Sequence, residues 1–208
     1  MRRKIVILFI IIITLVSLLL SACGKEEVLE DDDFESREDV GEYSWYRDRR
    51  AAFTKKIDDE NYVLVLYDAK TEEETEIKEV SGKLQGIKWS NGGVYLLVQE
   101  DIEDPKKTYI IDGRDKILKD EIMTVGDVQW SPDSSKLLIG VDDEEGKGDI
   151  DLGIYYLYGS KVKVIEEANE KVDYFPKSWE DDNMMVYVEK KDGKEETKSI
   201  KFDPDTHG

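Results

Sequence analysis

Short apolar segments separated by polar turns recur along the chain from residue 43 onward. The clearest example begins with alternating lysine and valine at 161–165, and Gly159 and Ser160 separate it from an apolar run at 152–158. A period of two is typical of a half-buried strand, and a Gly-Ser pair between two such runs favours a hairpin. The same reasoning predicts further strands at 51–54, 62–68, 74–80, 108–112, 116–119, 184–189 and 198–203. No helical period of apolar residues follows residue 22, so we predict an all-β fold.

Tryptophan recurs at positions 45, 89, 130 and 179, which are 44, 41 and 49 residues apart. Recurrence at this scale indicates a repeat architecture, and about 40–45 residues is the length of one four-stranded propeller blade. The best copy of the repeat runs over 128–140, where a short strand, the turn Trp-Ser-Pro-Asp and a second strand follow one another. The copy at 87–98 has Asn-Gly in place of Pro-Asp, and the copies at Trp45 and Trp179 keep only the tryptophan, a polar turn and a following strand.

The segment Trp130-Ser131-Pro132-Asp133 resembles the repeat signature of TolB-like and WD-type β-propellers, with Ser134 where glycine is usual. The resemblance implies a small propeller-like domain of about four four-stranded blades. The tryptophans are then expected to pack between blades rather than to form a ligand platform. The last repeat is one strand short, so the sequence leaves three arrangements open: a closed four-bladed ring, an open or incomplete arc, and a larger ring completed by a second copy in a homodimer.

The turn residues suit their positions for different reasons. Pro132 presets the backbone angle, and Asp133 is expected to accept a hydrogen bond from the chain just beyond it. In the second copy we expect both Gly92 and Gly93 to accept positive φ.

The first 22 residues have the three zones of an export signal. Three basic residues precede an apolar stretch at 5–20, and Ser21 and Ala22 stand before the only cysteine, Cys23. The 16 apolar-stretch residues are fewer than the roughly 20 that span a bilayer as a helix. Removal of the segment is therefore predicted, and the alternative is an uncleaved N-terminal membrane helix that also anchors the chain and faces it outward.

The tetrad Leu20-Ser21-Ala22-Cys23 resembles the lipobox of bacterial lipoproteins. The resemblance implies that the Cys23 thiol receives a diacylglycerol, with acyl chains such as palmitate, before the signal is cut. Two acyl chains give lasting attachment where one gives only reversible attachment. We therefore expect a protein on the cell membrane that faces away from the cytoplasm, and lipidation of Cys23 leaves no thiol for other chemistry.

These observations divide the chain into three parts. Residues 1–22 are the predicted lipoprotein signal peptide, 23–40 the lipidated cysteine and an acidic linker, and 41–208 the propeller-like domain. The linker is acidic and lacks periodicity, as expected of an extended tether. An alternative is that Val28, Leu29 or Phe34 adds a strand to the edge of the domain.

The formal net charge is −19, and loss of Arg2, Arg3 and Lys4 with the signal would make it three units more negative. Such a chain is not expected to bind nucleic acid or anionic lipid through its overall charge. It is expected to attract basic partners or divalent cations, although a dense negative surface also serves solubility alone.

We predict no catalytic residue and no cofactor. The only histidine, His207, is next to the last residue, and Cys23 is assigned to the lipid, so no Ser-His-Asp or Cys-His site can be composed. A carboxylate pair among the 49 acidic residues stays open. Two acidic clusters lack the order of a calcium loop, and the metal site is left unknown; they are Asp142-Asp143-Glu144-Glu145 with Asp149 and Asp151, and Glu100-Asp101-Glu103-Asp104.

Three functional hypotheses follow from the sequence. The first is a membrane-anchored, non-catalytic module that binds another protein or a cell-envelope component. The second is a sensor or carrier of a small ligand or divalent cation. The third is a carboxylate-based hydrolase.

Overall fold

Fourteen strands and no helix make up the part of the chain that the structure describes. The structure is a computed structural model that describes residues 36–47, 49–59, 61–81, 84–100, 104–142, 149–181 and 183–202. The strands, in chain order, are β1 (Val40–Tyr46), β2 (Arg50–Lys56), β3 (Asn61–Asp68), β4 (Glu73–Ser81), β5 (Leu84–Trp89), β6 (Tyr95–Glu100), β7 (Lys106–Asp112), β8 (Ile117–Trp130), β9 (Lys136–Asp142), β10 (Ile150–Tyr156), β11 (Lys161–Glu166), β12 (Val172–Asp181), β13 (Met184–Lys191) and β14 (Lys194–Lys201). The all-β prediction is confirmed, and no helix of the described residues is long and apolar enough to cross a bilayer.

The strands form four consecutive antiparallel units, which we call blades. The first blade has the order β1-β2-β3-β4, and the last has β12-β13-β14. The two blades between them share one seven-stranded sheet, β5 to β11, because β8 belongs to both. The first half of β8 pairs with β7 at the outer edge of the second blade, and the second half of β8 pairs with β9 at the start of the third blade.

A bend near Gly126 lets β8 pass from one blade to the next. Gly126 has a φ of +69°, which a side chain would strain. The buried Gln99 side chain donates to the Gly126 carbonyl at 3.1 Å and to Thr124 Oγ1 at 3.2 Å, while Thr124 shares a 2.7 Å hydrogen bond with Thr108. This buried polar network is satisfied at the point where the strand ladder is interrupted. Sequence reasoning placed separate strands here and missed their continuity.

The alternation of side chains along each strand gives every inner blade two apolar faces. Leu96 and Val98 of β6 lie in the core shared with the first blade, whereas Leu97 between them lies in the core shared with the third. In β9, Leu137 points to the second blade and Leu138 to the fourth. Each fully buried side chain of this kind contributes about 1.5–3 kcal/mol, so the blades are stable through their neighbours.

The tryptophans form a repeating ladder between blades. In the second to fourth blades, the indole N–H donates to the backbone carbonyl of the residue that precedes the tryptophan of the previous blade. The three bonds are Trp89 Nε1 to Ser44 O at 3.1 Å, Trp130 Nε1 to Lys88 O at 3.1 Å, and Trp179 Nε1 to Gln129 O at 3.4 Å. The predicted packing role is confirmed for these three residues, and the bond gives a physical reason for tryptophan rather than phenylalanine.

The turn after Trp130 is held by side chains that the motif supplies. Asp133 accepts from the Ser135 backbone N–H at 3.0 Å, as predicted, and from Lys136 Nζ at 2.8 Å. Buried Ser131 accepts from the Lys136 N–H at 2.9 Å. Ser134 has a φ of +60°, which explains why glycine is usual at this position.

The corresponding turn of the second blade partly corrects the prediction. Gly93 has a φ of +62°, but Gly92 is not in the left-handed region. Ser90 takes the place of Ser131 and accepts from the Tyr95 N–H at 3.1 Å.

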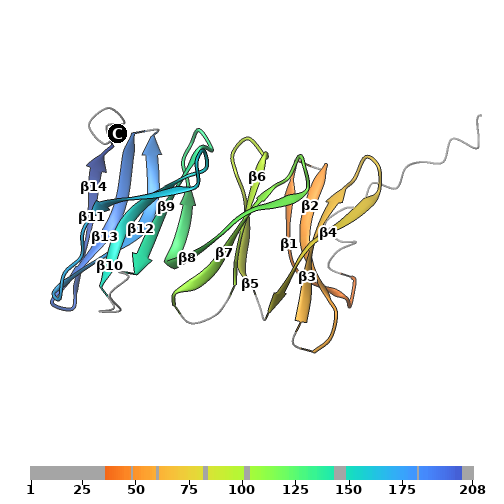
Figure 1. Cartoon of the computed structure of the whole chain (residues 1–208), viewed down its shortest axis with the longest axis horizontal. Coiled ribbons are helices and arrows are strands. Elements are labelled where there is room, and N and C mark those ends of the chain that lie inside the picture. Colours follow the sequence, from red (N-terminus) through yellow and green to blue (C-terminus); the bar gives the residue numbers. More distant parts are fainter. Residues whose placement is uncertain are drawn as a thin grey trace, which may run out of the picture.

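The blades follow one another in an open arc. In Figure 1 the first blade stands at the right end and β12–β14 at the left. The extensive contacts between described strands of different blades join consecutive blades, such as β1 with β5 and β12 with β8 and β10. The fourth blade has three described strands, as predicted. Of the three arrangements that the sequence left open, the single chain has the open arc.

Candidate functional site

Arginine is concentrated at one corner of the domain. The sequence contains seven arginines, and five of them lie in the described residues. Four of these five come from two turns, the β1–β2 turn and the β7–β8 turn. We call them, with a neighbouring lysine, the arginine corner; its members are Arg47, Arg49, Arg50, Arg114 and Lys116. In a chain with a net charge of −19, this concentration marks a site of opposite potential.

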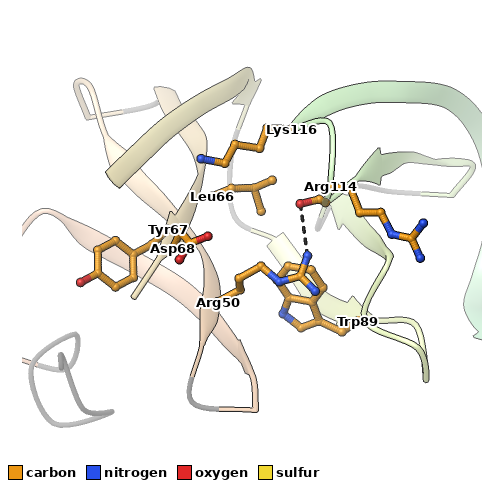
Figure 2. Close-up of a pocket in the computed structure, with 8 residues that line it drawn as sticks. Arg50, Leu66, Tyr67, Asp68, Trp89, Arg114 and Lys116 are labelled. Carbon is orange, nitrogen blue, oxygen red and sulfur yellow. Dashed lines mark hydrogen bonds between the residues drawn. The ribbon is translucent and has the colours of Figure 1, made fainter. Parts of the chain in front are cut away.

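Arg50 joins the first two blades at this corner. It begins β2, and its guanidinium donates to the Gly93 carbonyl at 2.7 Å and to the Gly113 carbonyl at 3.2 Å. Both acceptors are turn carbonyls of the second blade. Figure 2 shows the guanidinium lying beside the Trp89 ring, with the bond to Gly113 dashed. The position of Arg50 is therefore fixed by the contact between the blades.

Aromatic rings support the arginines. The Arg50 guanidinium carbon lies 5.4 Å from the centre of the Trp89 ring and 5.6 Å from that of Tyr46. The same atom of Arg47 lies 5.2 Å from the Tyr46 ring. Such cation–π contacts are worth about 0.5–1 kcal/mol at exposed sites, so they bias the guanidinium groups toward these positions.

Two hollows meet at Arg50. The first, of about 210 Å³, lies between the blades; it is lined by Arg50, Leu66, Tyr67, Asp68, Trp89, Gly113, Arg114 and Lys116. Figure 2 shows Lys116 reaching across it above Leu66, while Arg114 extends away from Arg50. The second, of about 400 Å³, is lined by Tyr46, Arg47, Arg49 and Arg50. Among the described residues, those that line this second hollow include no carboxylate, and Asp48 lies outside the described residues.

The charges of the arginine corner are poorly compensated within the described residues. Only Lys116 has an ion pair there, with Glu73 Oε2 at 3.8 Å. The nearby carboxylates serve the turns instead: Asp68 accepts from the Lys70 N–H at 2.9 Å and Asp112 from the Arg114 N–H at 2.8 Å. The side chains of Arg47, Arg49 and Arg114 form no hydrogen bond or ion pair with the rest of the described chain and are exposed.

Arg37, outside the arginine corner, has a structural role and is paired with carboxylates. Its guanidinium lies 2.9 Å from Glu74 Oε1 and 3.1 Å from Asp39 Oδ2. The hydrogen bond from Arg37 lowers the pKa of Asp39 below its ordinary value. At the arginine corner, by contrast, no intramolecular carboxylate takes this place among the described residues.

The predicted site residues fall in different parts of the chain. Cys23 and His207 lie outside the described residues, as do residues 101–103 and 143–148 of the two acidic clusters. Glu100 is buried and accepts from the Tyr109 hydroxyl at 2.9 Å, and Asp151 accepts from the Ala168 N–H at 2.6 Å. Among the described residues, no group of three or more metal-ligating side chains is assembled.

Sequence reasoning missed the arginine corner. The local signal was present, because three arginines fall within residues 47–50 directly after Trp45. From the sequence alone we predict only a polar turn at this run. Arg114 is more than 60 residues away along the chain, and only the packing of the second blade on the first brings its turn to the same corner.

No protein-family model matches this sequence, and no curated protein sequence matches it. Solved structures do. The β-propeller domain of the Trilobed protease from Pyrococcus furiosus, described as having an open velcro topology, is similar with a TM-score of 0.55 at 17% identity, over 80% of this chain and 56% of that one. The domain has the β-propeller fold.

Two further solved structures illustrate the range of the likeness. Pyrococcus horikoshii acylaminoacyl peptidase gives a TM-score of 0.53 at 14% identity, over 79% of this chain and 31% of that one. TolB from Acinetobacter baumannii gives 0.48 at 14% identity, over 78% of this chain and 41% of that one. The chain thus spans between 31% and 56% of the length of these three proteins. At these identities the likeness shows the propeller fold alone.

Proposed function

We propose that this protein is a non-catalytic binding module, held at the outer face of a membrane by a lipid on Cys23. The arginine corner is the observation that carries the binding part. It presents guanidinium groups that have no carboxylate partner among the described residues, in a hollow beside a rigid contact between two blades. Binding residues are often placed in this way, on turns that a rigid scaffold positions.

The anchoring part rests on the sequence. Basic residues, a short apolar stretch and the small residues before Cys23 form the pattern of a lipoprotein signal. The proposed partner is another protein or a component of the cell envelope. A membrane-tethered domain meets such partners at high local concentration, so modest affinity at one corner of the propeller is sufficient.

The proposal assigns no catalysis to the propeller. Peptidases are among the similar structures, but the chain covers only 31% of the Pyrococcus horikoshii enzyme. The sequence has one histidine, at position 207, and one cysteine, which we assign to the lipid. The proposal assigns neither residue a role as catalytic nucleophile or base.

The anchor is tested by intact mass analysis of the protein purified from membranes of its own host. We expect a chain that begins at Cys23 and carries the mass of a diacylglyceryl group, and we expect Cys23→Ser to retain the leader and lose the modification. An unmodified thiol on an intact leader would contradict the anchor.

The binding part is tested separately by crosslinking in cells. A photoreactive residue at position 49 is expected to give a discrete adduct with an envelope component, whereas the same residue at exposed position 190 is not. Equal adduct patterns from the two positions, or none from position 49 under several growth conditions, would count against a binding role for this corner.

A further inference from the structure

The chemistry of the arginine corner points to a particular class of ligand. We infer that the hollow lined by Tyr46, Arg47, Arg49 and Arg50 binds a phosphate group, and this inference rests on the proposed binding function. The shared chemistry is that of a phosphate monoester, whether it is part of a soluble molecule or of a lipid headgroup.

The residue type is the first argument. Guanidinium is planar and offers five N–H donors in a fixed fork, which matches the oxygens of phosphate or carboxylate; ammonium is a compact point charge. Elsewhere the described surface carries its positive charge almost entirely as lysine, and Arg37 is the one described arginine outside the corner. The one described arginine outside the corner thus has carboxylate partners within the chain. The arginines of the corner have no such partner among the described residues.

Preorganisation is the second argument. Arg50 is held by two backbone carbonyls and two aromatic rings, and these bonds use two of its five N–H groups. Three N–H groups remain for a ligand. The guanidinium group of Arg47 lies against Tyr46, one of the two rings that also contact Arg50. A ligand that binds here orders fewer side chains than at a loose surface cluster, which lowers the entropic cost of binding.

The number of cations favours phosphate over a single carboxylate. One guanidinium fork satisfies both oxygens of a carboxylate. A phosphate monoester has three terminal oxygens and carries about −1.5 to −2 charges at pH 7, so it can use several forks at once. Three guanidinium groups line the hollow of about 400 Å³, and the described residues that line it include no carboxylate.

The surrounding charge also sets how binding should respond to salt. Arg47 and Arg49 are exposed, and the Debye length falls from about 10 Å at 0.1 M salt to about 3 Å at 1 M. Affinity for phosphate is therefore expected to fall steeply as ionic strength rises.

The test is a titration of the purified full-length chain in neutral detergent, at low ionic strength and pH 7.5. The probes are inorganic phosphate, glycerol 3-phosphate, succinate of the same charge, and the detergent-soluble short-chain lipids dihexanoyl phosphatidylcholine and dihexanoyl phosphatidic acid. The readouts are calorimetric heat and ligand-dependent melting temperature. We expect both soluble phosphates to bind more tightly than succinate.

Matched variants locate the site. Arg47→Gln/Arg49→Gln is expected to weaken phosphate binding at least tenfold, which corresponds to about 1.4 kcal/mol. Arg47→Lys/Arg49→Lys keeps the charge and is expected to weaken it by several-fold, because the fork is lost. Lys190→Gln/Lys194→Gln removes the same charge from an exposed corner of the fourth blade and is expected to bind as the parent does.

Each contrary outcome is decisive. Equal loss in the Lys190→Gln/Lys194→Gln control would mean that overall charge, not the hollow, attracts the anion, and equal affinity for succinate would mean that the site does not select phosphate. Either result overturns the inference. Tighter binding of dihexanoyl phosphatidic acid than of glycerol 3-phosphate would identify the lipid headgroup as the source. Crosslinking in cells reports on the proposed function and this titration on the ligand class, so either can fail alone.

Discussion

The glycine in the Trp-Ser turn of the second blade offers a sharp test of how the first two blades fit together. Gly93 has a φ of +62°, and a Cβ built on it would lie within 2.5 Å of three atoms of the Tyr46 ring, well inside van der Waals contact. Gly93→Ala therefore has two costs: the left-handed backbone and the displacement of Tyr46 from its place beside Trp89 and the arginines.

The two costs can be separated with a matched glycine. Gly159 has a φ of +88°, and a Cβ there would have no atom within 4 Å, so Gly159→Ala measures the backbone cost alone. That cost is about 1–2 kcal/mol for a left-handed alanine. The loss of the Tyr46–Trp89 contact adds about 0.5–1.5 kcal/mol, so Gly93→Ala should destabilise by about 1.5–3.5 kcal/mol.

The assay is urea and thermal unfolding of the purified chain, followed by tryptophan fluorescence. For a domain of this size, about 1 kcal/mol shifts the melting temperature by about 2–4 °C, so Gly93→Ala should lower it by roughly 3–14 °C. Tyr46→Ala should destabilise the parent but add little to Gly93→Ala, because the ring is already displaced. Equal effects of Gly93→Ala and Gly159→Ala, or full additivity with Tyr46→Ala, would refute the steric argument.

Three further predictions concern the blades beyond the arginine corner. Trp130→Phe should cost about 1 kcal/mol in urea unfolding, since it leaves the Lys88 carbonyl without its indole donor; no loss would remove the tryptophan ladder as a stabilising feature. Burial alone would raise the pKa of Asp133, but hydrogen bonds within its turn hold that pKa well below the ordinary 3.8. The stabilisation of the folded state by the Asp133 carboxylate should therefore be complete above about pH 4 and be lost as the pH falls further. Asp133→Asn should then flatten the acid limb of a stability–pH curve, and an unchanged limb would contradict this. Burial and a short hydrogen bond to Asp120 raise the pKa of Tyr155 to about 12, and Tyr155→Phe should raise the pKa of Asp120 in an NMR titration; an unmoved Asp120 would count against the bond between the second and third blades.

Local patterns in the sequence were enough to predict most of the strands and the turn after Trp130, but not the continuity of β8 or the φ of Gly92. The alternation at 161–165 became β11, and the Gly159-Ser160 hairpin has positive φ at both residues. The Trp-Ser-Pro-Asp segment predicted the Asp133 hydrogen bond correctly. These features depend on side chains within a few residues of one another, so the sequence alone contains the information.

The tertiary structure decided what the sequence left open. The first and fourth blades lie at opposite ends of an open arc, and β8 runs without a break through two blades. The arginine corner exists because the turn at Gly113 packs against Arg50, 63 residues earlier in the chain. Spacing along the chain says that blades follow one another, but the angle between them is set by packing of many side chains at once. For the same reason, the sequence shows that Arg47, Arg49 and Arg50 are near one another, but only the packing of the second blade fixes the position of Arg50.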